Sequence, residues 1–522
     1  MMRRRGLILL LAGFALSVSG CLRFGWDRLS TKVPSAVLAT MKAEDIAKDL
    51  HALEGEGHAQ RPPFGETERR TLRHLTRRFA QIGLKGAGDN GKFLEAVPAV
   101  ATQVREAELQ VGSIKLRQGD NLLLSARSDS TRITIPSSQL VFAGRGVVAP
   151  ERRRDDYSGL VVAGRVVLLF ADFAAASPDT TDWYSHWQYQ VAEARRHGAL
   201  GVLLMPDSTR SAQEWQLYKD RFESFALFRS EELKEHCRFQ AWISAEAGTR
   251  ILKEAKIEFA RARWAAHTRG FRGRVLEPKV RGTVELDLRQ SRSFNVVGEI
   301  PGRYDEEQSI IICAPWDGGS ANAQAMAGLL ALASAFSSLP QRPARSVVFV
   351  ATTLSTRGQL GAEHFAHFSS RSLDRCAGAL VLRGDDARES APESARGEAV
   401  PDTPGGKAGF KVQGSESALD TLQLEGTGDN ELGKFLSEAA EMDGLAVRAS
   451  RDESAWFRSG AVAFARRGVP SALIGTRMSE LRMALRAGYR MAQTRGGPRW
   501  DADSCFRFYP RESLVAYADS LR

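Results

Sequence analysis

Histidine and cysteine are scarce in this chain. Its 522 residues include 9 histidines and 5 cysteines, and no histidine follows His367. Because histidine, cysteine and carboxylates are the usual zinc ligands, residues 368–522 lack two of these three ligand types almost entirely. No two cysteines are closely spaced, so neither a Cys-x-x-Cys metal site nor a redox pair is predicted.

The N-terminus also lacks an apolar run long enough to span a bilayer. The run Leu7–Val18 has about 12 residues, whereas a spanning helix needs about 20. It follows Arg3-Arg4-Arg5 and ends in Ser19-Gly20-Cys21. This pattern resembles a bacterial lipoprotein signal over residues 1–20. An ordinary secretory signal and an uncleaved anchor are the alternatives.

The resemblance implies that Cys21 becomes the acylated first residue, with palmitate among its fatty acyl chains, and that residues 21–40 form a tether. Two or more acyl chains hold a protein durably on a membrane. Leu22 follows the cysteine, where aspartate would favour the inner membrane. We therefore expect a lipid-anchored protein of the bacterial cell envelope, at the outer membrane.

Acidic residues are outnumbered, which gives a formal net charge of +10. The signal removes three arginines, so the mature chain keeps 10 − 3 = +7. The remaining excess is spread along the chain beside acidic or polar residues, which is typical of a solvated surface. It is compatible with attraction to anionic lipid or cell-wall polymer. No nucleic-acid-binding motif occurs, so no nucleic-acid partner is predicted.

Helical periodicity marks the beginning of the mature chain. A helix is predicted to start at Ala43, and residues 66–82 carry Leu72, Leu75 and Phe79 at helical spacing. Gly83 then follows at the position where glycine commonly ends a helix. We assign residues 41–135 to an N-terminal segment that packs on a larger domain.

Apolar strands and glycine turns follow one another in the second half. A buried strand is predicted at Ser309–Pro315 and is followed by Trp316 and Asp317. Further motifs occupy residues 293–302, 345–352, 358–362 and 457–470. In this order they resemble the di-zinc aminopeptidases of metallopeptidase family twenty-eight (clan MH), which are related to glutamate carboxypeptidase and transferrin receptor. The resemblance implies an α/β fold of the aminopeptidase type over residues 286–522, with three layers around a central mixed, mostly parallel sheet.

A second module is expected between these two parts. Residues 142–170 contain glycine turns and the apolar run Val166–Phe170, and residues 192–204 read as a helix followed by a strand. They resemble a protease-associated domain of mixed β and α structure. We place this inserted module and its connection at residues 136–285.

The family's metal positions are occupied by unsuitable residues. The resemblance aligns these positions with Pro315, Gln324, Thr356, Arg383 and Ala461. Asp317 and Ser355 are vestiges of the catalytic machinery in this comparison. Proline and alanine offer no side-chain donor atom, and arginine repels a cation. The sequence therefore predicts no catalytic residue, no metal site and no cofactor, zinc being required only if the alignment is wrong.

Two neighbouring segments offer substitutes for the missing ligands. A shifted alignment would place Asp385 or Asp386 at the third position, but residues 385–408 read as a polar, disordered loop. His364 and His367 lie three apart in a predicted helix, where surface histidines are a simpler interpretation than a metal site.

These observations favour a catalytically inactive peptidase-like protein that binds or scaffolds. Its expected partners are the membrane, through the lipid anchor, and an envelope protein or peptide-like ligand. The main alternative is an active zinc aminopeptidase that releases N-terminal residues from peptides. A metal-free hydrolase that uses Ser355 or Ser459, and a structural lipoprotein without a specific ligand, complete the hypotheses.

Overall fold

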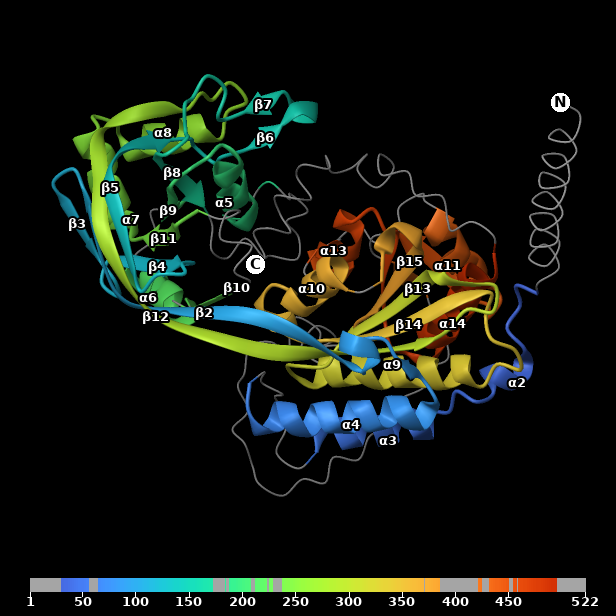
Figure 1. Cartoon of the computed structure of the whole chain (residues 1–522). Coiled ribbons are helices and arrows are strands. Elements are labelled where there is room, and N and C mark those ends of the chain that lie inside the picture. Colours follow the sequence, from blue (N-terminus) through green and yellow to red (C-terminus); the bar gives the residue numbers. More distant parts are fainter. Residues whose placement is uncertain are drawn as a thin grey trace, which may run out of the picture. The chain divides into compact units, whose positions relative to one another are not determined.

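Two compact units make up the described part of the chain (Figure 1). The computed structural model describes residues 30–55, 64–171, 184, 187–207, 212–222, 225–228, 237–369, 371–384, 421–424, 431–449, 454–457 and 459–494. The first unit takes the described residues up to Glu95, Phe294–Thr356 and those from Gly361 on, and the second takes Ala96–Ser293 with Arg357–Leu360. The predicted signal, most of the tether and the predicted loop 385–408 lie outside the described residues.

The second unit is larger than the module expected at residues 136–285. The reason is that two long strands, β2 (Leu94–Val111) and β12 (Arg274–Ile300), each begin in one unit and continue into the other. Residues 96–135 therefore belong with the second unit and not with the N-terminal helices. Neither long strand was predicted from the sequence.

Parallel strands dominate the sheet of the first unit. The order is β18-β15-β13-β14, and all three pairings are parallel. The end of β12 pairs antiparallel with β14, with Val296 opposite Ala351, and β1 pairs antiparallel with β12. These strands are β1 (Lys85–Gly86), β13 (Asp305–Pro315), β14 (Arg345–Thr352), β15 (Cys376–Leu382) and β18 (Ser471–Ile474). The predicted α/β class with a mixed, mostly parallel sheet is confirmed.

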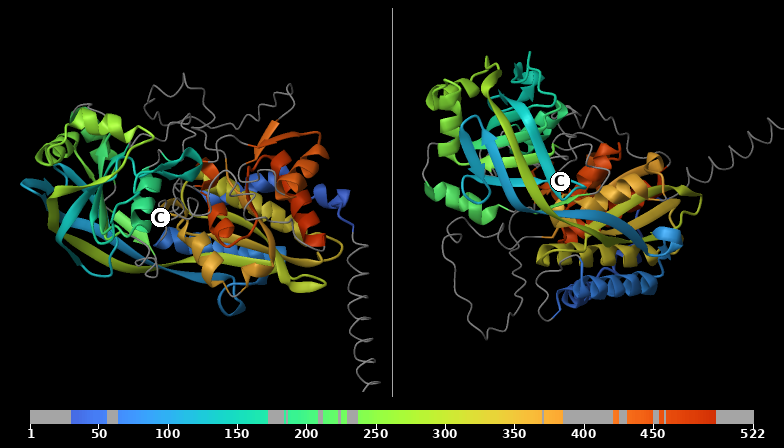
Figure 2. Two further views of the ribbon diagram at one scale, coloured as in Figure 1. Left: turned by 90° about the horizontal axis from the view of Figure 1, so that it is seen from above. Right: turned by 60° about the vertical axis from the view of Figure 1, so that its left-hand side comes forward.

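Helices cover both faces of this sheet. Alternate strand residues such as Ile310 and Ile312 pack in one core with α9 and α14. The helices α3 and α4 stack on α9, as both views show (Figures 1 and 2). On the opposite face Phe365 of α10 contacts Phe464 of α13. The helices are α2 (Ser35–Leu38), α3 (Ala43–Glu54), α4 (Glu66–Ile82), α9 (Ser320–Ser337), α10 (Leu360–Phe368), α11 (Glu431–Glu441), α12 (Ser454–Phe457), α13 (Ala461–Arg466) and α14 (Met478–Gln493).

The local predictions for this unit agree with the structure. The helix α4 has the predicted bounds, and Gly83 ends it in the left-handed conformation with φ 87°. The strands β13 and β14 end where the apolar runs end. A small parallel pair, β16 (Thr421–Leu424) with β17 (Ala446–Ala449), was not predicted.

The second unit is also α/β. In its sheet β5, β8, β9 and β11 are parallel, and β12 and β4 flank them antiparallel. One face packs against α7 and α8, and the other packs against α5 and α6. The strands are β3 (Ile114–Arg117), β4 (Leu122–Ala126), β5 (Arg132–Phe142), β6 (Val148–Ala149), β7 (Arg154–Asp155), β8 (Val166–Ala171), β9 (Gly201–Pro206), β10 (Phe225–Phe228) and β11 (Phe239–Ile243). The helices are α5 (Trp187–Arg196), α6 (Ala212–Arg221), α7 (Ala245–Glu254) and α8 (Phe259–Ala266).

The helix-to-strand segment predicted at residues 192–204 corresponds to the end of α5 and β9. The assignment of this unit as a protease-associated domain stays a prediction. Within the described residues, no helix combines the length and the apolar character that crossing a bilayer requires.

Candidate functional site

The candidate site lies at one edge of the first unit's sheet. Strands β13 and β14 run in parallel, and their last residues, Pro315 and Thr352, are register partners. Because parallel strands end at the same edge, the segments that follow them are brought together. Asp317 and Ser355 come from these two segments, so the topology accounts for their contact.

A buried hydrogen-bond network links the two predicted vestigial residues. The Asp317 side chain is fully buried. Its Oδ1 accepts a hydrogen bond of 2.5 Å from the Ser355 hydroxyl, and both carboxylate oxygens lie 3.1 Å from the Ser355 backbone N–H. Hydrogen bonds to a carboxylate are shorter and stronger than those between neutral groups. The carboxylate that would orient a metal ligand in the resembling enzymes is thus occupied by donors from this chain.

Asn322 completes the network from the first turn of α9. Its Nδ2 donates to the Asp317 carbonyl at 2.6 Å and to the Ser355 hydroxyl oxygen at 3.1 Å. Gly318 allows this approach, because a Cβ there would lie 2.9 Å from Asn322 Nδ2 and its φ of 88° disfavours other residues. Ser355 therefore donates one hydrogen bond and accepts another. Sequence reasoning missed Asn322, although a polar residue in the first turn of a predicted helix was a usable signal.

The turn after β14 is held in an unfavourable backbone conformation. Leu354 is buried and has a φ of 55°, in the left-handed region that costs a non-glycine residue about 1 kcal/mol. The two neighbouring backbone N–H groups are both fixed: that of Thr353 donates to Asn295 Oδ1 at 3.0 Å and that of Ser355 donates to Asp317. These contacts keep Ser355 at the site despite the strain.

Asn295 connects this turn to a buried carboxyl group. Its Nδ2 donates to Glu95 Oε2 at 2.7 Å and to the Gly361 carbonyl at 2.9 Å. Burial raises the pKa of Glu95 to about 7, although the hydrogen bond from Asn295 opposes the shift. The sequence motif around Asn295 was recognised, but its link to Glu95, 200 residues away in the chain, could not be predicted.

The structure places three more predicted positions around this edge, at different depths. Gln324 is half-buried in α9, and Thr356 is exposed beside Ser355. Arg383 is exposed directly after β15, and its backbone N–H donates to the Ile474 carbonyl of β18 at 2.8 Å. The next residue, Gly384, lies against the Ala321 carbonyl in the first turn of α9. The predicted grouping of these residues therefore holds at the level of the sheet edge.

Ala461 does not belong to this group. It is fully buried, and its carbonyl accepts a hydrogen bond of 2.8 Å from the Ser471 hydroxyl. Ser471 opens β18 and pairs with Ala379, which is level with Ile311 of β13. That level is four residues before Pro315, or about 13 Å along a strand. Ala461 was expected to line the site, but its burial excludes this.

The two serines proposed as nucleophiles have structural partners. Ser459 Oγ donates to the Trp456 carbonyl at 2.7 Å and accepts from the Ala461 backbone N–H. Ser355 donates to Asp317, whose carboxylate is a weak base for a serine hydroxyl. The geometry therefore does not support a metal-free serine hydrolase.

The residues at the site do not fit a zinc pair. Pro315 carries no side-chain donor, Arg383 carries a fixed positive charge, and the Asp317 oxygens accept hydrogen bonds from Ser355. Across the described ranges, no group of three or more His, Cys, Asp or Glu side chains is arranged to hold a metal ion. His364 and His367 do lie in α10, where their rings stand 5.2 and 5.9 Å from that of Phe368.

Comparison with known proteins relates this part of the chain to a peptidase family. Residues 295–504 match the family model described as Peptidase family M28, over about two fifths of the chain. The matched range contains the whole candidate site. It supports the aminopeptidase-like character inferred from the motifs. No curated protein matches the sequence.

Solved structures of aminopeptidases are similar to the chain at low sequence identity. An aminopeptidase from Aneurinibacillus sp. strain AM-1 is 17% identical, with a TM-score of 0.46, over 89% of this chain and 97% of that one. A zinc aminopeptidase from Bacillus subtilis is 14% identical, with a TM-score of 0.41, over 86% and 94%. A peptidase M28 precursor from Shewanella amazonensis SB2B is 12% identical, with a TM-score of 0.38, over 93% and 94%.

Proposed function

We propose that this protein is a lipid-anchored component of the bacterial cell envelope whose aminopeptidase-like domain binds a partner without hydrolysing peptides. The observation that carries this proposal is the closed network of Asp317, Ser355 and Asn322. A metallopeptidase needs open ligand positions and a base for the metal-bound water. Here the one carboxylate at the corresponding edge is engaged by donors of the protein itself.

The network is also costly to open. A hydrogen bond to a charged group contributes about 1.5–3 kcal/mol, and Asp317 accepts such bonds from both the hydroxyl and the backbone N–H of Ser355. A cation would have to break them and would still lack the donors that Pro315 cannot supply. The residues at this edge are therefore better suited to keeping the loops in place than to catalysis.

The exposed residues of the same edge suggest the chemistry of a ligand. Arg383 is exposed, and a guanidinium group can hold a carboxylate through two parallel hydrogen bonds. Thr356 offers a hydroxyl nearby. A peptide-like ligand with a free carboxylate, or an acidic segment of an envelope protein, fits these groups.

The anchor part of the proposal depends on Cys21, which lies outside the described residues. Growth with labelled palmitate should label the protein, and Cys21→Ser should abolish both the label and recovery in the outer-membrane fraction. If the serine variant stays fully membrane-bound, the acyl anchor is not what holds the protein there.

Enzyme assays separate the proposal from its main rival. The family match favours an active zinc aminopeptidase as the second candidate. Purified protein supplied with zinc should show no turnover of aminoacyl and dipeptide substrates, and turnover that EDTA removes would establish the rival.

Binding is tested separately with acidic peptides. Arg383→Ala should lose at least tenfold in affinity, as expected when about 1.4 kcal/mol is removed. Arg467→Ala is the matched control, since Arg467 is another exposed arginine of the first unit. Equal effects of both variants would show non-specific attraction, and no effect of either would leave the edge without a ligand.

A further inference from the structure

A second feature of interest lies in the second unit, at α8 and the segment after it. Residues 259–276 contain five arginines but no aspartate or glutamate. Four of these arginines are exposed, together with Trp264 and Val275. We call this set the α8 surface; its members are Arg261, Trp264, Arg269, Arg272, Arg274 and Val275.

Trp264 is the most exposed large apolar residue of the described chain, at 73%. The buried face of α8 is formed by Phe259, Ala262 and Ala266, so Trp264 points away from the core. Arg261 lies three residues before it and therefore shares its helix face. A tryptophan that remains in water next to arginines forgoes the burial of most of its ring, which is typical of a surface that meets a partner.

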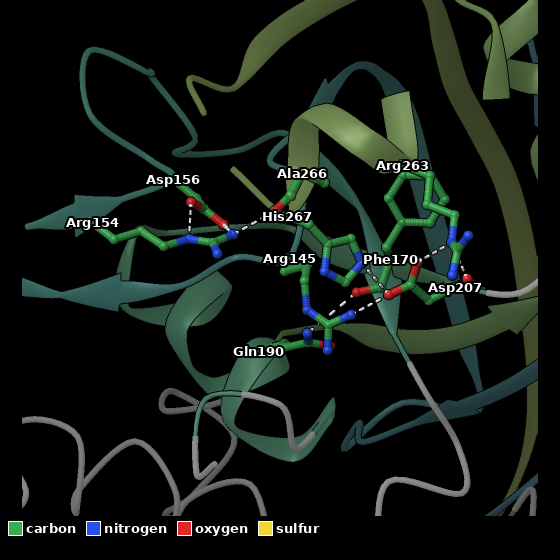
Figure 3. A network of polar contacts seen from close by, with 9 residues as sticks. All are labelled: Arg145, Arg154, Asp156, Phe170, Gln190, Asp207, Arg263, Ala266 and His267. Carbon is green, nitrogen blue, oxygen red and sulfur yellow. Dashed lines mark hydrogen bonds and ion pairs between the residues drawn. The ribbon is translucent and has the colours of Figure 1, made fainter. Parts of the chain in front are cut away.

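The helix is fixed to the unit by its other polar residues (Figure 3). Arg263 Nε lies 3.0 Å from Asp207 Oδ1, and His267 Nε2 lies 2.9 Å from Asp207 Oδ2. Arg154 donates to the Ala266 carbonyl at 2.6 Å. These contacts connect α8 to the end of β9 and to β7. The outward residues are thus presented by a helix that is held in place, and Arg263 is not part of the presented charge.

The charge of the α8 surface is not neutralised within the unit. Among the described residues no acidic side chain forms an ion pair with Arg261, Arg269, Arg272 or Arg274. The nearest glutamate in sequence beyond them, Glu277, instead faces Lys256 at 3.8 Å. The surface therefore combines four unpaired positive charges with exposed apolar groups.

We propose that the α8 surface docks on an anionic lipid bilayer. Arginine side chains pair with lipid phosphates, and tryptophan prefers the boundary between headgroups and acyl chains. The Cys21 motif would bring the chain to a membrane, where a second contact orients it. A nucleic-acid strand fits less well, because it would need several aromatic side chains for stacking.

The test measures vesicle binding without the acyl anchor. The chain from residue 22 onward is sedimented with phosphatidylcholine vesicles, with or without phosphatidylglycerol. Binding should require the anionic lipid and should weaken strongly at high salt, because the Debye length shortens from ~10 Å at 0.1 M to ~3 Å at 1 M. Since the anchor and the peptidase-like site take no part, failure here would leave the proposed function untouched.

Two matched pairs of variants locate the binding surface. Replacing Arg261, Arg269 and Arg272 by glutamine should weaken binding on the order of 100-fold. The control replaces Arg69, Arg70 and Arg73 of α4, which are 63–70% exposed, and should have a much smaller effect. Trp264→Ser should cost about tenfold, whereas Val161→Ser, at another exposed apolar residue, should change nothing.

Three outcomes would overturn the proposal. One is equal weakening by both triple variants, which would make net charge the cause. Another is binding to vesicles of phosphatidylcholine alone. The third is binding of linear polyphosphate or an oligonucleotide that matches vesicle binding and does not respond to Trp264→Ser, which would indicate a polyanion site. Circular dichroism confirms that each variant is folded before binding is compared.

Discussion

Replacing Ser355 with alanine tests whether this residue stabilises the structure or serves catalysis. The hydroxyl is buried, donates to Asp317 and accepts from Asn322. Residues that serve catalysis often reduce stability, so their removal is neutral or stabilising. A residue that holds a network together has the opposite effect.

The expected magnitude follows from the two lost contacts. The hydrogen bond to the Asp317 carboxylate is worth about 1.5–3 kcal/mol, and a neutral one from Asn322 about 1 kcal/mol. The Ser355 backbone N–H still serves Asp317 in the variant, which reduces the loss. We expect a net destabilisation of about 2 kcal/mol, or a melting temperature lower by about 4 °C.

Thermal unfolding followed by circular dichroism measures this change. Thr356→Ala is the matched control, because it removes the neighbouring hydroxyl from an exposed position. Such a surface change should stay within about 0.5 kcal/mol. A Ser355→Ala protein as stable as the parent, or more stable, would refute the interpretation of the network.

Three further predictions concern buried polar groups of the first unit. Glu95 has a folded pKa of about 7, raised by burial, so its contribution to stability is complete below the unfolded pKa of about 4.5 and is lost as pH rises toward 7; Glu95→Gln should flatten the dependence of the unfolding midpoint on pH between 5 and 8, and an unchanged slope would contradict the assignment. Asn295→Ala should lower the free energy of unfolding by about 3 kcal/mol, since it leaves the Thr353 N–H unpaired, and an effect under about 1 kcal/mol would show that water replaces the amide. Glu363→Gln should cost about 3 kcal/mol by leaving Arg466 as a buried charge without its ion pair, and Glu363→Gln combined with Arg466→Met should recover part of the loss in the same assay.

Much of the first unit could be predicted from the sequence because its signals are local. The apolar runs that form β13 and β14 predict buried strands, and the helical spacing of Leu72, Leu75 and Phe79 predicts α4. The order of these elements then led to the aminopeptidase-type fold. The long strands β2 and β12 escaped prediction because their alternation is interrupted by polar residues on faces that only the tertiary structure defines.

The candidate site was predictable only in part. Its residue types were enough to question a zinc site, since Pro315 and Arg383 cannot serve as ligands whatever their geometry. The contacts that replace the metal were not predictable, because Asn322 and Ser355 meet Asp317 through side-chain distances that sequence spacing does not contain. Ala461 was misplaced for the same reason: a motif alignment gives order along the chain but not depth below the surface.

Zinc titration of the purified protein tests the central claim most directly. The parent protein is freed of metal, and zinc binding is followed by calorimetry, with elemental analysis of the protein as isolated. The account predicts substoichiometric zinc as isolated and no saturable binding that raises the melting temperature. Two zinc ions per chain, bound tightly enough to raise the melting temperature and to support turnover of an aminoacyl substrate, would contradict it.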